Sequence, residues 1–383
     1  MTEHTTTQCL LFPDIFDRPV VAKFDQRQGS SDGGAVLLKA ADQRLGLTSS
    51  LAACLKDERQ AGKIWHEIEE LLTQRVMGMA LGYEDANDAA GLASDPVHKL
   101  LVGRDPIDGD DLASQPTLSR FENAPDRKQL FCMGEALADC VIERHRKRLH
   151  GRARRITIDL DPTDDPTHGQ QQFSFFNSHY DCHCYLPVVC FLTFKRRIVY
   201  KAEVTRHPHR DPKDNPRFVV TNMKQSPQWL YEQVYCQRGD LENRIKELHY
   251  GMEIGRTSCS SFWANQFRVL MTAAAYVLMQ ELRLRLTRTD CARAQVSTLR
   301  ERFLKLGAQV IASVRRIVLH LPHSFPYRDG FYRLALSLGA FPRLPEQNRR
   351  LQHSVSSHGR GLVHHRCRSP TSGSRDRLFC GAP

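Results

Sequence analysis

Apolar side chains recur every three or four residues through much of residues 35–148, which is the spacing that places them on one face of an α-helix. The pattern predicts helices over 35–47, 51–55, 64–81, 117–121 and 128–148. Glycines follow or interrupt several of these runs, as expected where helices end. We therefore predict an all-helical domain over residues 35–150, preceded by an irregular arm over residues 1–34.

The pattern changes from helical to strand-like near residue 154. Alternating and β-branched positions predict strands over 155–161, 172–177, 184–194, 198–204 and 217–221. Helical spacing then returns, and it predicts helices over 228–250, 262–286 and 294–306. Residues 308–321 fit a strand or a helix, and we favour a strand. These elements indicate a second domain over residues 151–342, in which a sheet is flanked by long helices, and an α+β or α/β fold for the whole chain.

Composition is that of a globular protein, with 41% hydrophobic and 25% charged residues among 383. No apolar run is long enough to span a membrane, and the N-terminus lacks the pattern of a signal peptide, so we expect a cytoplasmic protein with no membrane partner. The 12 cysteines are scattered, which favours reduced thiols over a disulfide framework.

The formal net charge of +11 first suggests a polyanion, and nucleic acid above all. However, residues 343–383 hold eight Arg against Glu346 and Asp376, so more than half of the net charge lies there. This segment shows no usable periodicity, and we predict a disordered basic tail. A nucleic-acid function therefore has to be argued from site residues.

An acidic strand end is the strongest candidate for chemistry. Asp159 and Asp161 stand two apart on the strand predicted over 155–161, so they are expected on one face, and Asp164 and Asp165 follow in a turn. Carboxylate oxygens at a strand end suit hard cations such as Mg²⁺ or Mn²⁺. The alternative interpretation is a solvated acidic turn.

The helix predicted over 228–250 carries the second candidate. Tyr235, Arg238 and Glu242 share a face because they are three and four residues apart. One interpretation is an Arg–Glu pair on a solvated helix, which is worth about 0.3–0.5 kcal/mol. The other is a carboxylate metal ligand whose cationic and hydroxyl neighbours bind phosphate.

Together these segments resemble bacterial insertion-sequence transposases of the DDE type. Asp159-Leu-Asp-Pro-Thr-Asp-Asp-Pro-Thr-His-Gly-Gln-Gln, followed by Tyr180-Asp-Cys-His-Cys-Tyr-Leu-Pro, is similar to the region of that family's first catalytic strand. Tyr235-x₂-Arg238-x₃-Glu242 resembles its signature Tyr-x₂-Arg-x₃-Glu-x₆-Lys. Further similarity lies at 81–88, 114–123, 256–259 and 264–268. The whole resemblance covers roughly residues 19–341.

The resemblance implies a ribonuclease H-like core and metal-dependent cleavage and transfer of DNA strands at the ends of an insertion sequence. Three acidic residues of such a core hold two divalent cations, Mg²⁺ or Mn²⁺. The implied partners are double-stranded DNA, as terminal inverted repeats and as target, and further copies of the chain in a synaptic complex. The implied location is the nucleoid.

The resemblance also assigns roles to residues of this chain. The first carboxylate falls on Asp161, with Asp159 as the alternative, and the last falls on Glu242. Tyr235 and Arg238 take the signature positions, and Arg238 would contact a DNA phosphate.

The signature Lys is replaced in this chain by His249, and Lys246, one turn earlier, is a partial substitute. The basic stretch that includes Arg154 and Arg155 adjoins the acidic strand and is a second candidate for phosphate contact.

The family's middle Asp is where this chain departs from the pattern. The family places that Asp at the end of a later strand that leads into a helix, and residues 194–227 predict no such unit. Only 81 residues separate Asp161 from Glu242, too few for the remaining strands and crossover helices. The join near 194–198 resembles an internal deletion, and Asp211 and Asp214 are the available substitutes.

We therefore expect an internally shortened transposase with an incomplete ribonuclease H-like mixed sheet and impaired catalysis. The alternative is a catalytically inactive, DNA-binding remnant that keeps residues 35–150, the helical DNA-binding domain implied by the resemblance. A structural zinc site at Cys182 and Cys184 is a third possibility, and we expect Phe173, Phe175 and Phe176 in the core rather than on a base-stacking surface.

Overall fold

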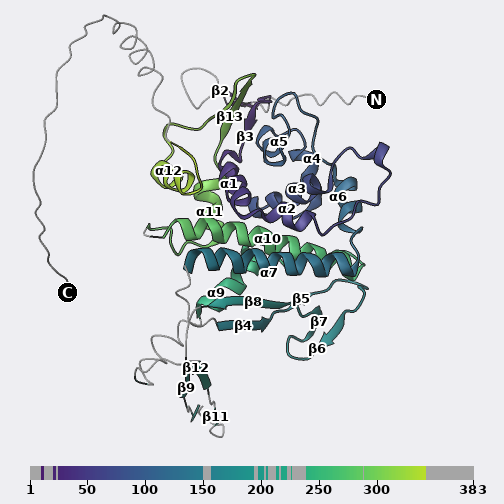
Figure 1. Ribbon diagram of the computed structural model, residues 1–383, viewed down its shortest axis with the longest axis vertical. Coiled ribbons are helices and arrows are strands. Elements are labelled where there is room, and N and C mark those ends of the chain that lie inside the picture. The colour runs from purple at the N-terminus through teal and green to yellow at the C-terminus, as the bar shows by residue number, and fades with distance from the viewer. Residues whose placement is uncertain are drawn as a thin grey trace, which may run out of the picture. The chain divides into compact units, whose positions relative to one another are not determined.

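The computed structural model describes most of residues 25–341 together with two short strands before them (Figure 1). The described residues are 10–12, 20–22, 25–149, 157–193, 197–201, 204–205, 213–214, 217–221, 226, 239–287 and 289–341. Contacts divide the chain into residues 1–340 and residues 341–383, and of the second unit only Phe341 is described. The tail predicted over 343–383 therefore lies outside the described residues.

The first half of the chain is helical, as its apolar spacing predicts. Its helices are α1 (Val36–Leu45), α2 (Leu47–Ala52), α3 (Ile68–Leu81), α4 (Ala89–Leu92), α5 (Pro96–Val102), α6 (Gln115–Glu122) and α7 (Arg127–Leu149), with 3-10 turns at Gly33–Ala35, Ala61–Lys63 and Ala86–Asp88. Gly46 and Gly82 follow α1 and α3 with φ of 62° and 89°, a left-handed conformation that glycine adopts without strain.

The second half contains α9 (Gly239–Lys246), a π-helix (Glu247–Gly251), α10 (Phe262–Arg285), α11 (Val296–Leu299), a second π-helix (Arg300–Leu304) and α12 (Arg328–Ser337). α10 packs against α1, α3 and α7, and Figure 1 shows it lying alongside α7. The core takes side chains from 35–133 and from 248–338, so it includes both sides of the predicted boundary at residue 150.

Buried ion pairs join these helices across the core. Arg75 of α3 binds Glu122 of α6, with Nε 2.6 Å from Oε1, and both side chains are buried. Arg144 of α7 binds Glu281 of α10 at 2.6 Å, and Arg285 binds the same carboxylate. Arg144 therefore contributes to packing rather than to a basic surface. Removing one partner of such a pair is strongly destabilising, because the other charge is left buried without compensation.

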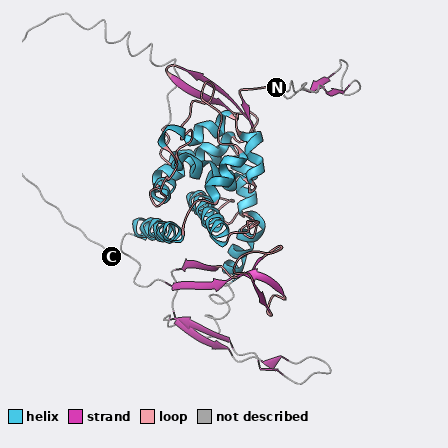
Figure 2. Cartoon of the chain, turned by 90° about the vertical axis from the view of Figure 1, so that its right-hand side faces the viewer, coloured by secondary structure: helices cyan, strands magenta, loops and turns pink. Residues whose placement is uncertain are grey.

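The strands form six small sheets, and every pairing among the described residues is antiparallel. β1 (Leu10–Phe12) pairs β2 (Val20–Ala22), and β3 (Gly29–Ser30) pairs β13 (Ala308–Ser313), which pairs β14 (Arg316–His320). The remaining sheets are β4 (Thr157–Pro162) with β8 (Val188–Thr193), β5 (Asp165–Pro166) with β7 (Cys182–Tyr185) and β6 (Phe175–Asn177), β9 (Arg197–Lys201) with β12 (Arg217–Thr221), and β10 (Val204–Thr205) with β11 (Lys213–Asp214). Figure 2 shows β13 and β14 against one side of the clustered helices and the strands β4 to β12 on the opposite side, and the fold is α+β, as predicted.

Two predicted strands prove to be pairs of strands. The strand expected over 184–194 is broken at Leu186 and Pro187, where proline has no N–H to give a ladder. The strand expected within 308–321 turns at Val314 and Arg315 and returns as β14. In both places the strand assignment is confirmed and the turn was missed.

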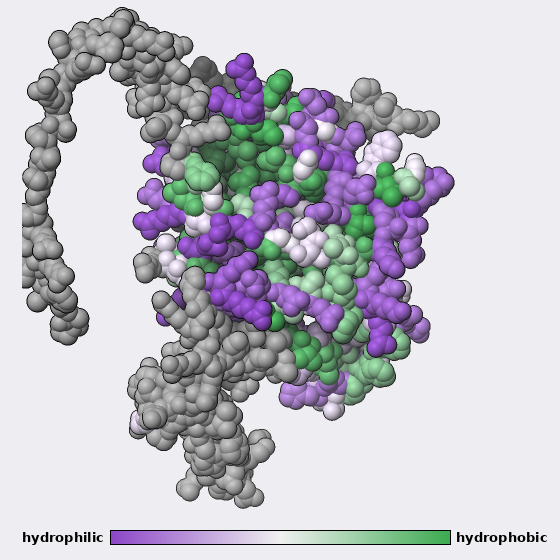
Figure 3. All heavy atoms as spheres, viewed as in Figure 1, coloured by the Kyte–Doolittle hydropathy of each residue, from purple (hydrophilic) through white to green (hydrophobic). Residues whose placement is uncertain are grey.

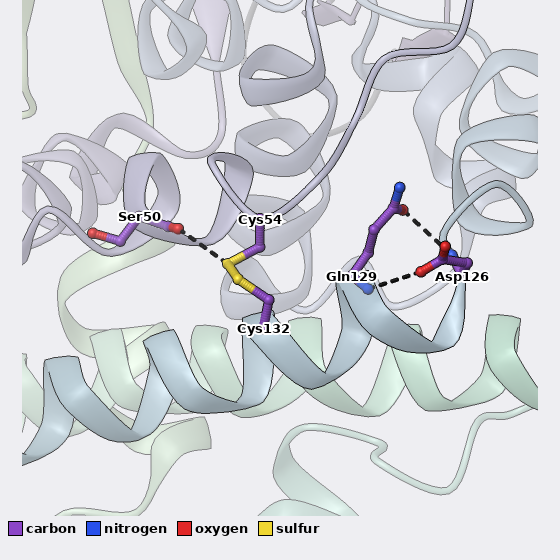
Figure 4. The surroundings of a disulfide bond; sticks show 5 residues. All are labelled: Ser50, Cys54, Asp126, Gln129 and Cys132. Carbon is purple, nitrogen blue, oxygen red and sulfur yellow. Dashed lines mark hydrogen bonds between the residues drawn. A yellow bond between two sulfur atoms is a disulfide. The ribbon is translucent and has the colours of Figure 1, made fainter.

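A disulfide joins Cys54, just after α2, to Cys132 of α7, with the two Cα atoms 5.6 Å apart (Figure 4). The prediction of reduced thiols is wrong for this pair, because spacing along the chain does not reveal that two helices meet there. Beside it, Asp126 caps α7: its Oδ1 accepts from the Gln129 N–H at 2.8 Å, and the Gln129 side chain accepts from the Asp126 N–H (Figure 4).

Candidate active site

β4 places the predicted acidic residues in a defined register. Asp159 stands opposite Phe191 and Asp161 opposite Val189 of the antiparallel β8. This backbone ladder confirms a strand at 157–162, as the alternation of residues 155–161 predicts. The described part of the chain includes the backbone of both aspartates and not their side chains, so their role as ligands stays a prediction.

α9 carries Glu242 at its middle and continues directly into the π-helix Glu247–Gly251. Lys246 is the last residue of α9 and is exposed to solvent. Of the other predicted site residues, Tyr235, Arg238, Arg154, Arg155 and Asp211 lie outside the described residues.

A hydrogen bond brings these two elements together. The Oγ1 of Thr163, two residues after Asp161, lies 2.5 Å from Nε2 of His249, seven residues after Glu242. Thr163 is buried, and its N–H donates to the carbonyl of Pro187 at 3.0 Å. The end of β4 and the turn that follows α9 are therefore in direct contact, although they are 86 residues apart in sequence.

The π-helix is itself fixed to the helical core by a buried carboxylate. Glu247 accepts from Arg283 at 2.5 Å and from the Tyr276 hydroxyl at 2.9 Å, both on α10, and from Arg244 at 3.0 Å. These bonds satisfy a charge that would be costly to bury alone. They hold the C-terminal end of the α9 segment against α10.

A second buried carboxylate follows the acidic strand. Asp165 is 2% exposed, and both of its oxygens accept from the hydroxyl of Thr257, at 2.9 and 3.0 Å. Burial disfavours the charged form and raises the pKa of Asp165 to about 6. Asp165 therefore links the β5–β7–β6 sheet to the segment before α10. It is not the solvated turn residue of the alternative interpretation.

Asp165 also lines a cavity of about 470 Å³ between the β5–β7–β6 sheet and the start of α10. Its other walls are mainly aromatic and amide side chains: Phe173, Phe175, Phe176, Asn177, Tyr185, Phe262, Asn265 and Gln266. Asn265 is already engaged with the backbone of Cys259 through both side-chain atoms. The cavity is thus mostly apolar, with an ionisable group in its lining.

Three of these aromatic residues contradict their prediction. Phe173, Phe175 and Phe176 are between 56% and 71% exposed, whereas the sequence led us to expect them in the core. Figure 3 shows apolar surface over this part of the molecule. The small sheet has too little neighbouring structure to cover both of its faces, so that the side chains on β6 reach solvent.

The described residues between 193 and 226 contain strands and no strand-to-helix unit of the kind expected for a middle Asp. Asp214 lies on the two-residue strand β11, which pairs β10. Nor do the described residues bring three or more His, Cys, Asp or Glu side chains together as a metal cluster. Cys182 and Cys184 lie on β7, so a zinc role for them rests on sequence alone.

The residues predicted as ligands nevertheless have donor atoms that suit a divalent cation. Asp159, Asp161 and Glu242 offer only carboxylate oxygens, the ligands preferred by Mg²⁺ and Mn²⁺. The elements that carry them adjoin through the Thr163–His249 bond.

Sequence reasoning missed two of these contacts. Thr163 stands in the Asp161-x-Thr163 pattern and His249 at the signature Lys position, so both belong to motifs that the sequence shows. The sequence does not show that the two residues are paired. Thr257 lies in a segment that resembles the family and was given no role. Nothing in the sequence indicates that it reaches Asp165.

Comparison with known proteins identifies the family of the chain. A family model, that of the transposase DDE domain group 1, matches the chain in two segments, residues 12–199 and residues 193–342. The protein is thus of the DDE transposase class. It belongs to the family transposase DDE domain group 1, which confirms the resemblance drawn from its motifs.

No curated protein and no solved structure shows significant similarity to the chain. Among the described helices, none has the length and apolar character needed to cross a bilayer.

Proposed function

We propose that this chain is a shortened transposase that binds the ends of an insertion sequence and cleaves and joins DNA strands there at a reduced rate. Asp161 and Glu242 would hold divalent cations, Mg²⁺ or Mn²⁺, with Asp159 as the alternative to Asp161. Bound cations of this kind activate water or a 3′-hydroxyl and stabilise the leaving oxygen.

The residues around the carboxylates would bind and orient DNA. Arg238 offers a planar guanidinium that matches phosphate oxygens, and Tyr235 adds a hydroxyl on the same helix face. Lys246, Arg154 and Arg155 would contact flanking phosphates of the inverted repeats and of the target. Further copies of the chain would pair two DNA ends in a synaptic complex at the nucleoid.

The observation that carries this proposal is the contact between Thr163 and His249. It joins the strand end after Asp161 to the turn after Glu242, the two motifs that resemble the family's first and last catalytic segments. A solvated acidic turn and an unrelated surface helix have no reason to meet in this way.

One observation supports the shortening. The two segments matched by the family model overlap at residues 193–199, next to the join expected from sequence. Without the middle carboxylate, one ligand of a two-cation site is missing, and we expect catalysis to fall by orders of magnitude.

The alternative function is DNA binding without chemistry. The observation in its favour is the helical core, which among the described residues takes its buried side chains from 35–133 and 248–338. Both functions predict that DNA affinity falls steeply as salt rises.

Strand cleavage and joining on DNA that carries the inverted repeats flanking the gene, with Mn²⁺, would separate the two functions. Slow, metal-dependent cleavage that disappears in Asp161→Ala and Glu242→Gln, and survives in the surface control Asp139→Ala, would support a shortened enzyme. Binding without any cleavage would support the remnant. Fast cleavage abolished by Asp161→Ala would contradict the shortening and direct attention to Asp211 or Asp214.

A further inference from the structure

We propose that Thr163 and His249 are a positioning pair that sets the spacing between the strand of Asp161 and the helix of Glu242. His249, at the position of the signature Lys, would then serve the metal site through Thr163 rather than bind phosphate. This inference rests on the proposed function, since it concerns the carboxylates that the function uses.

Thr163 is held from two directions. Its N–H donates to the carbonyl of Pro187 at the start of β8, and its hydroxyl lies 2.5 Å from the His249 ring. Its side chain is buried, so water does not compete freely for the hydroxyl. With both bonds made, the backbone two residues after Asp161 has little freedom to shift.

His249 is held equally firmly from its own side. Glu247 ties the π-helix to Arg283 and Tyr276 of α10, and the Gly251 carbonyl accepts from Arg300 at 2.9 Å. A π-helical turn carries more residues than an α-helical one, and such turns are common at functional sites. Here the wider turn stands at the position from which the His249 ring reaches Thr163.

The consequence concerns distance between ligands. Glu242 precedes His249 by seven residues, or about 10 Å along a helix, and Asp161 precedes Thr163 by two. The Thr163–His249 bond is thus a crosslink two residues from Asp161 and about two helical turns from Glu242. Functional constellations must be held within about 0.5 Å, so loss of this crosslink should weaken cation binding even if the chain stays folded.

Mn²⁺ binding to the full chain, followed by titration calorimetry or electron paramagnetic resonance, tests the pair. We expect Thr163→Val and His249→Phe, which remove the hydrogen bond, to lower the affinity for Mn²⁺ by about tenfold or more. Thr163→Ser keeps a hydroxyl and His249→Gln keeps a nitrogen near the Nε2 position, so both should stay within about twofold of wild type. Tyr250→Phe, which alters an exposed neighbour of His249, is the matched control.

Melting temperature, measured on the same samples, separates positioning from mere folding. A purely structural role predicts lower melting temperatures with unchanged Mn²⁺ affinity in the folded protein, and that result would overturn the inference. If Asp161→Ala abolishes binding but Thr163→Val and His249→Phe bind like wild type, the inference alone fails. If wild type itself binds no Mn²⁺, the proposed function fails and the inference with it.

Discussion

The helices α3, α7 and α10 and the strands β4 to β12 belong to one chain but are stabilised in different ways. The helices share a continuous core in which side chains such as Phe267 are fully buried, and charged groups such as Glu122 are buried with their partners. The strands form separate sheets of two or three members, and aromatic residues of β6 reach solvent.

The two regions therefore differ in how much a change in sequence should cost. Small sheets with exposed faces are marginal unless neighbouring structure covers them. The helical part is stabilised by buried contacts among its own helices. The strand part carries Asp159 and Asp161, so two of the carboxylates predicted as metal ligands lie on the less strongly stabilised region.

The sharpest test of the comparison is the same substitution in both regions. Phe267→Ala should lower the free energy of unfolding by about 3–5 kcal/mol, because it empties a site packed edge-to-face on Phe121. Phe175→Ala should change it by less than about 0.5 kcal/mol, since that ring is 71% exposed. Denaturant unfolding measures both, and equal losses would break the comparison.

Buried charge offers a second test of the helical part. Glu122→Ala should cost about 3–5 kcal/mol, because Arg75 is left buried without its counter-charge. Glu143→Ala on α7 removes a carboxylate that is 52% exposed and 3.7 Å from Lys147, so it should cost less than about 1 kcal/mol. If urea midpoints of the two variants coincide, the buried pair does not stabilise the core as described.

The pKa of Asp165 allows a test at the edge of the strand region. Its raised pKa, about 6 against 3.8 for a free carboxyl, means that the folded chain keeps a proton that the unfolded chain has lost. Stability should therefore fall as pH rises from about 4 to 6, by about 3 kcal/mol in all. Asp165→Asn should lack this fall in denaturant unfolding measured across that range. Parallel pH profiles for the two proteins would contradict it.

The smallest expected effect concerns the start of α7. Asp126→Ala removes the cap on the Gln129 N–H and should cost about 1 kcal/mol, whereas Asp126→Asn should cost only a few tenths. Thermal unfolding distinguishes the two variants. A cost as large as that of Glu122→Ala would mean that helix ends, and not core contacts, dominate the stability of the helical part.

Local periodicity was enough to predict most of the elements. The helix expected over 128–148 is α7, and the one expected over 262–286 is α10, with bounds that differ by one residue at most. These predictions hold because each helix repeats its apolar spacing over several turns.

Contacts between distant segments were beyond the reach of periodicity. The Thr257–Asp165 bond spans 92 residues and the Cys54–Cys132 disulfide spans 78, and neither leaves a repeat in the sequence. Exposure of Phe175 was missed for the same reason, because a strand's pattern shows which residues are apolar but not whether anything lies against them. The motifs behind Asp161 and Glu242 indicated the family, and the pairing of Thr163 with His249 came only from the structure.

The antiparallel pairing of β3 with β13 brings distant parts of the chain together, since Gly29 and Ser30 lie against Gln309 and Ala308. This pairing joins the chain just before the helical part to the chain near its end. The stretch between α7 and α9 is an insertion within the helical part. Halving the length of a loop changes its closure entropy by only about 0.6 kcal/mol, so a deletion within this stretch has a small entropic effect on the helical part. Such a deletion would leave the pairing of β3 with β13 in place.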